Sequence, residues 1–117
     1  MSIALITGSC GLVGSESVDF FSNKGFEIIG IDNNLRQHFF GKDASVIWQK
    51  KKLTKTYKKY KHFNTDIRNY NGLKKIFKKF KKIIIIEDHS EIGGLSEIVK
   101  SFAYECKYFH SILSYSL

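Results

Sequence analysis

Short apolar runs alternate with amphipathic stretches along most of this 117-residue chain. The runs are rich in β-branched residues, as buried strands are, and helical periodicity separates them. Strands joined by helices in this alternation form parallel sheets, so the pattern predicts an α/β fold. The predicted strands are residues 3–6, 26–31, 61–65 and 83–86.

Three stretches show the spacing of amphipathic helices. The first follows residue 12, carries apolar residues at 12, 13, 18, 20 and 21, and ends before Gly25, a helix C-cap. The clearest spans residues 70–82, with four apolar residues at i, i+3, i+4 and i+7 and six lysines at the other positions from 74 onward. The third covers residues 95–106. Residues 33–60 predict a loop, a short helix at 46–48 and a basic connector from Lys50.

A glycine-rich turn joins the first strand to the first helix. Gly8 permits a tight exit from the strand, Gly11 leaves room for a phosphate, and Gly14 lets the helix lie close to the strand. The unpaired amides of the first helical turn favour an anion at that point. The turn predicts a pyrophosphate site formed by Gly8, Cys10, Gly11, Leu12, Val13 and Gly14.

The second strand ends at Asp32, eighteen residues after Gly14. A carboxylate at this distance is expected to bind the adenosine ribose of a dinucleotide. The alternative is a glycine turn in an ordinary α/β protein, with Asp32 as a turn residue at the end of a strand.

The spacing Gly-x-x-Gly-x-x-Gly resembles the extended branch of the short-chain dehydrogenase/reductase superfamily, the NAD-dependent epimerases and dehydratases. Further short motifs are most similar to the N-terminal part of the CDP-paratose 2-epimerase group, and the likeness covers residues 1–82. They are Leu5-Ile6-Thr7-Gly8, Gly30-Ile31-Asp32-Asn33-Asn34-Leu35-Arg36, Phe39-Phe40-Gly41, Ala44-Ser45, Trp48 and Thr65-Asp66-Ile67-Arg68.

The resemblance implies a partial Rossmann-type parallel sheet of about four strands in the order 3-2-1-4, with helices on both faces. It implies NAD as cofactor, with Asp66 and Ile67 at the adenine and residues 36–48 near the ribose and substrate. Asn33, Asn34 and Arg36 complete the candidate cofactor-binding residues. Two alternatives stay open, namely that Asp66 caps the following helix and that residues 36–48 form a helix packing Trp48 on the sheet.

The resemblance also implies a Tyr-x-x-x-Lys catalytic pair after the fourth strand. The two matches, Tyr57 with Lys61 and Tyr70 with Lys74, precede that strand, so we assign no catalytic residue. We expect residues 1–86 to be the N-terminal part of an NAD-binding domain and residues 87–117 a divergent tail with one cover helix.

The function that follows is the NAD-binding part of a truncated nucleotide-sugar epimerase, which would act on its nucleotide sugar only if the chain were completed. The alternatives are a non-catalytic nucleotide-binding fragment and a basic nucleic-acid-binding protein. Residues 50–82 hold fourteen of the nineteen Lys and Arg residues and a single acid. Because no aromatic stacking array accompanies them, we expect a solvated face without sequence-specific nucleic-acid binding.

Two cysteines without metal-ligand spacing predict a reducing compartment and no metal site. No apolar run approaches the roughly 20 residues of a membrane span, and no secretory signal precedes the first strand, so we expect a cytoplasmic protein without membrane contact. Residues 83–86 lack a fifth strand to pair with. Such an edge predicts limited solubility, chaperone association or a homodimer through this strand.

Overall fold

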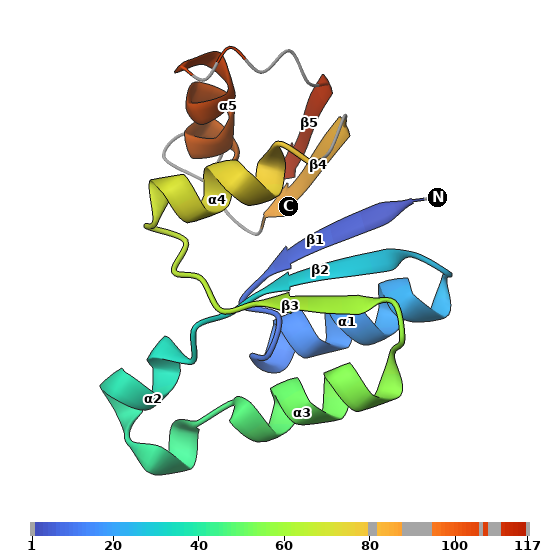
Figure 1. Cartoon of the computed structure of the whole chain (residues 1–117), viewed down its shortest axis with the longest axis vertical. Helices are drawn as coiled ribbons and strands as arrows, with labels where there is room; N and C mark the ends of the chain where they lie inside the picture. Colours follow the sequence, from blue (N-terminus) through green and yellow to red (C-terminus); the bar gives the residue numbers. More distant parts are fainter. Residues whose placement is uncertain (1, 80–81, 88–94, 106, 108–110, 117) are drawn as a thin grey trace. The chain divides into compact units, whose positions relative to one another are not determined.

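A computed structural model describes residues 2–79, 82–87, 95–105, 107 and 111–116 of the chain (Figure 1). The chain divides into two compact units, Met1–Gly72 and Leu73–Leu117. The first unit contains the glycine turn and every candidate cofactor-binding residue.

Three parallel strands form the sheet of the first unit. They are β1 (Ile3–Thr7), β2 (Glu27–Ile31) and β3 (Tyr60–Phe63), in the order β1-β2-β3. Thr7 pairs with Ile31 and Ile31 with Phe63, so the three strands end side by side. The α/β class and the 3-2-1 part of the predicted order are confirmed.

Two helices cover one face of this sheet, α1 (Leu12–Asn23) and α3 (Ile47–Thr56) (Figure 1). Both crossovers return the chain to a neighbouring parallel strand, which places their helices on the same side. The core between these helices and the sheet is built from Cys10, Val18, Ile28, Leu53 and Tyr60. This packing fixes the carboxyl ends of the strands, where the candidate residues lie.

The connection between β2 and β3 is more helical than its sequence predicts. It contains α2 (Leu35–Phe40), a 3-10 turn at Lys42–Ala44 and α3. The prediction of a short helix at 46–48 followed by a basic connector from Lys50 is wrong, since α3 runs from Ile47 to Thr56. Lysine is a good helix former, and Gln49 and Leu53, four residues apart, bury one side of α3. Trp48 is 65% exposed, so the alternative in which it packs on the sheet does not hold.

The second unit contains α4, which begins in the first unit and spans Tyr70–Phe77, β4 (Lys82–Glu87), α5 (Leu95–Glu105) and β5 (Ser111–Ser116). The predicted helix over residues 70–82 is too long, because Lys82 already belongs to β4 and pairs with Ser111. The predicted tail helix is present as α5. The rings of Phe77 and Phe102 lie 5.9 Å apart, joining α4 to α5.

Residues 83–86 do have a partner strand. The expectation that they lack one is wrong, because β5 pairs with β4 in parallel from Lys82↔Ser111 to Glu87↔Ser116. Three of the six residues in segment 111–116 are serines, so the segment does not resemble a buried parallel strand, and its sequence did not predict one. An unpaired strand therefore no longer argues for a homodimer. The place of residues 83–86 beside β1 stays a prediction.

Candidate functional site

The turn after β1 is closed by backbone hydrogen bonds. Gly8 has φ +63°, a left-handed conformation that glycine adopts without strain. Its N–H donates to the Ile31 carbonyl at 2.8 Å, and its own carbonyl accepts from the Gly11 N–H at 2.9 Å. The turn is thereby tied to the end of β2 before α1 begins.

Gly14 lies directly against this turn. A Cβ at this position would stand 1.9 Å from the Gly8 carbonyl oxygen and 2.9 Å from the Ser9 Cα. No real Cβ makes such contacts, so only glycine lets the first turn of α1 approach the loop this closely. The ladder of α1 starts with Ser15 N–H to Gly11 O, and the amides of residues 12–14 precede it.

Asp32 links the end of β2 to the glycine turn. One carboxylate oxygen accepts from the Cys10 N–H at 3.1 Å, and the other accepts from the Asn34 N–H at 2.8 Å. These bonds fix the orientation of the carboxylate, and each oxygen keeps a lone pair for another donor. The arrangement leaves the carboxylate able to accept further hydrogen bonds from hydroxyl groups.

Asp66 lies beyond the end of β3 and forms an ion pair with Arg68 at 2.6 Å. The hydrogen bonds from the Arg68 side chain and then from its backbone N–H lower the pKa of Asp66 to about 2. Asn33 donates to the same carboxylate at 3.2 Å, which joins the loops after β2 and β3. Asp66 is therefore an ionised acceptor at physiological pH.

These loops surround a cavity of about 470 Å³. It combines the glycine turn at Gly8 and Gly11 with the acids after β2 and β3. Seven of the predicted site residues line it: Gly8, Gly11, Asp32, Asn33, Arg36, Asp66 and Ile67. The structure thus gathers residues that are up to 59 positions apart in the sequence.

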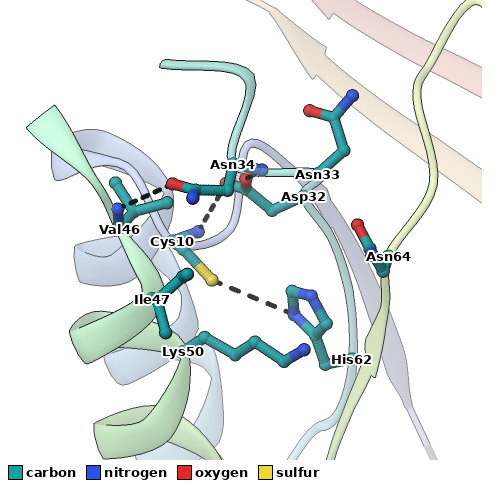
Figure 2. Close-up of a pocket in the computed structure, with 9 residues that line it drawn as sticks. All are labelled: Cys10, Asp32, Asn33, Asn34, Val46, Ile47, Lys50, His62 and Asn64. Carbon is teal, nitrogen blue, oxygen red and sulfur yellow. Dashed lines mark hydrogen bonds between the residues drawn. The ribbon is translucent and has the colours of Figure 1, made fainter. Parts of the chain in front are cut away.

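A second cavity, of about 290 Å³, lies against α3 and shares Asp32, Asn33 and Val46 with the first. Figure 2 shows Cys10 and His62 facing each other there, with the Lys50 side chain beside the imidazole. The Asn34 side-chain oxygen accepts from the Val46 N–H at 2.8 Å, so this amide anchors the start of α3. Asn34 itself has φ +56°.

Three predicted residues line neither cavity. Gly14 packs against the turn, while Leu12 and Val13 are 82% and 76% exposed and do not belong to the buried side of α1 that the amphipathic spacing predicts. Only their backbone amides are available to a phosphate at the helix start. The roles of all the site residues stay predictions.

The predicted cofactor-binding residues do not include several residues that complete the larger cavity. Phe39 lies four residues after Leu35 on α2, and both line the cavity, a spacing that becomes meaningful only once α2 is known to be a helix. Thr65 and Arg68 flank the predicted pair Asp66 and Ile67 and also line the cavity. Val46 lies within residues 36–48, for which the resemblance implies a place near the ribose and substrate, but no feature of its own distinguishes it.

A parallel sheet with a glycine turn after its first strand and an acid after its second is the architecture of Rossmann-type nucleotide-binding domains. Residues 5–105 match the family described as GDP-mannose 4,6 dehydratase. The chain belongs to this family and carries a sugar dehydratase/epimerase-type domain, for which NAD(P) is the general cofactor. The match continues past residue 82, where the resemblance of the motifs ends. No curated protein matches the chain.

The geometry fits such a cofactor. Gly8, Gly11 and Gly14 leave a cradle that a Cβ would fill or distort. The cavity beside this cradle is also lined by Asp32 after β2 and by Asp66 after β3. Among the described residues, no helix is both long and apolar enough to cross a membrane.

Proposed function

We propose that the first unit binds NAD and serves as the cofactor-binding part of a nucleotide-sugar epimerase. The observation that carries the proposal is the shared cavity, which brings the glycine turn, Asp32 and the Asp66–Ile67 pair together. A glycine turn serving only to connect a strand with a helix would not require both acids to open onto the same space.

Each part of the cavity has a distinct task in this proposal. Gly8, Gly11 and the amides of Cys10, Leu12, Val13 and Gly14 form the pyrophosphate cradle, where the positive end of α1 favours an anion. Asp32, with Asn33, Asn34 and Arg36 around it, receives the adenosine ribose. Asp66 accepts from the adenine amine, and the Ile67 amide addresses a ring nitrogen.

Bound NAD would supply hydride chemistry, taking a hydride from a sugar carbinol and returning it. This chain's residues bind and orient the adenosine half and hold the pyrophosphate. The motifs around Asp32 and Asp66 support the CDP-paratose 2-epimerase type within the wider family. On these motifs, we propose that the substrate is a CDP-sugar and that the reaction is its epimerisation.

Asp66→Asn tests the adenine end of the site. We expect NAD to bind about tenfold more weakly, because the amide presents one acceptor in place of two, and hydrogen bonds to charged acceptors contribute about 1.5–3 kcal/mol. AMP should lose the same factor, since it carries the same adenine. Calorimetry on the wild-type chain and the variant measures both.

Asp43→Asn is the matched control, because Asp43 is exposed in the 3-10 turn and lines neither cavity. Its affinities should equal those of the wild-type chain. Absence of any NAD binding by the wild-type chain would refute the proposed function, and an unchanged Asp66→Asn affinity would remove Asp66 from the adenine site.

The 117-residue chain alone should show no turnover of a CDP-sugar. In the structure, the Tyr57 hydroxyl donates to Asp19, and the Lys61 ammonium pairs with Glu27. This tyrosine and lysine therefore do not form the pair that lowers a phenol pKa. Incubation with NAD and a CDP-sugar, followed by chromatography, measures the product. Turnover abolished by Tyr57→Phe or Tyr70→Phe would show that one of these pairs is catalytic.

A further inference from the structure

The glycine turn is supported by side chains to which the nucleotide-binding motifs give no role. Ser9 is completely buried, and its hydroxyl lies 3.0 Å from the Tyr60 hydroxyl of β3. The Tyr60 hydroxyl lies in turn 3.0 Å from His62 Nδ1. We propose that Tyr60 and His62 are positioning residues for the cofactor turn, acting through this partly buried series of hydrogen bonds to Ser9.

Gly30 makes the contact possible. Tyr60 belongs to β3, whereas the glycine turn follows β1, so the tyrosine has to cross the intervening strand β2. A Cβ at residue 30 would stand 2.4 Å from the Tyr60 hydroxyl and 2.6 Å from the Ser9 Oγ. The glycine in the middle of β2 therefore leaves the space in which the two hydroxyls meet.

These side-chain hydrogen bonds support the turn at Ser9, where the backbone hydrogen bonding is weak. The Ser9 N–H reaches the Ile31 carbonyl only at 3.3 Å, and the Cys10 N–H depends on Asp32. The Ser9–Tyr60 contact adds a second anchor beside that Asp32 bond. Removal of either hydroxyl would take one hydrogen bond from the other hydroxyl, which stays buried. A missing hydrogen bond in a protein interior lowers stability.

His62 sets which hydroxyl donates in each hydrogen bond of this series. When Tyr60 donates to Nδ1, the imidazole is neutral, and Ser9 donates to the Tyr60 oxygen. Burial lowers the pKa of His62, and the neighbouring Lys50 ammonium lowers it further. Asp32 acts in the opposite sense. The other titratable groups at this contact are Tyr60 and the Cys10 thiol, whose Sγ lies 3.9 Å from Nδ1, and burial raises the pKa of both.

A pH profile tests whether His62 is neutral in the folded chain, as an imidazole that accepts from Tyr60 must be. The unfolded chain protonates an ordinary histidine near pH 6.5, whereas folded His62 takes its proton at lower pH. The contribution of neutral His62 to the free energy of unfolding should therefore be fully present above about pH 7, and it should be lost as the pH falls through about 6.5 and below. In His62→Asn, the side-chain oxygen still accepts from Tyr60 but does not titrate.

The proposal rests on NAD binding by this unit, and a double-mutant cycle tests it with a second readout. We expect Ser9→Ala and Tyr60→Phe each to weaken NAD binding about tenfold, and the double variant to lie within about twofold of either. Amide exchange at residues 9 and 10 of the NAD-free chain should accelerate by at least a similar factor. Tyr57→Phe, whose hydroxyl contacts Asp19 on α1, is the matched control and should resemble the wild-type chain.

Equal behaviour of Tyr60→Phe and Tyr57→Phe, or fully additive effects of Ser9→Ala and Tyr60→Phe, would overturn the proposal. If the wild-type chain binds no NAD, the proposed function fails, and the exchange rates alone decide the positioning role. If Tyr60→Phe does not fold, melting curves decide it. His62→Asn should then lose less melting temperature than the wild-type chain between about pH 7 and 5, spanning the ordinary histidine pKa, and parallel losses would contradict the proposal.

Discussion

Gly14→Ala should abolish measurable NAD binding and lower the free energy of unfolding by about 2 kcal/mol, within the range that overpacking costs. The new Cβ would stand 1.9 Å from the Gly8 carbonyl oxygen, which belongs to the backbone and has no rotamer to move into. Relief requires α1 to move away from the turn, and that movement opens the proposed pyrophosphate cradle. Calorimetry with NAD and denaturant unfolding measure the two effects.

Two further alanine variants provide comparisons for Gly14→Ala. Glu16→Ala, on the exposed side of α1, changes a neighbouring residue of the same helix without touching the turn, and it should leave both quantities unchanged. Gly11→Ala places its Cβ 3.3 Å from the same carbonyl oxygen, a contact that a small adjustment accommodates. Its stability should lie between the other two. A Gly14→Ala variant as stable as Glu16→Ala would contradict the packing argument.

The part of this fold that its sequence predicts is the part encoded locally. The spacing of Gly8, Gly11 and Gly14 reflects contacts within one strand-turn-helix unit, so a few consecutive residues are sufficient to show it. Asp32 ends an apolar run, and its place at the sheet edge follows from parallel strands ending together. The larger cavity is therefore largely predictable, because its residues follow successive strands.

The remainder depends on contacts between distant segments. The extent of α3 is set by burial of Gln49 and Leu53. The lysines between and after them obscure the apolar periodicity that would predict this helix. Strand β5 is defined by its pairing with β4, and serine-rich residues 111–116 carry no apolar pattern of their own. The Ser9–Tyr60 contact joins residues 51 positions apart, and no local pattern announces it.

The wild-type chain should bind NAD at least tenfold more tightly than NADP, because the Asp32 carboxylate repels a phosphate on the ribose hydroxyl that it would otherwise bind. The bonds from Cys10 and Asn34 hold the carboxylate in place, so it does not turn away from a second anion. Arg36 lines the same cavity and attracts that phosphate, which moderates the preference. Calorimetric titration with each cofactor measures the ratio of the dissociation constants.

Asp32→Asn should reduce the preference for NAD to about threefold or less, because the amide carries no charge to repel the phosphate. NAD itself should bind about tenfold more weakly, a loss of the size expected when a hydrogen bond to a charged group is not made. The amide has one acceptor oxygen, and its NH₂ group would face the N–H of either Cys10 or Asn34. Arg36→Ala should act in the opposite direction and widen the preference. Asp43→Asn provides the matched control for the lost charge. Equal or tighter binding of NADP by the wild-type chain, or unchanged NAD affinity in Asp32→Asn, would place the ribose away from Asp32 and leave that carboxylate with the structural task of anchoring the turn.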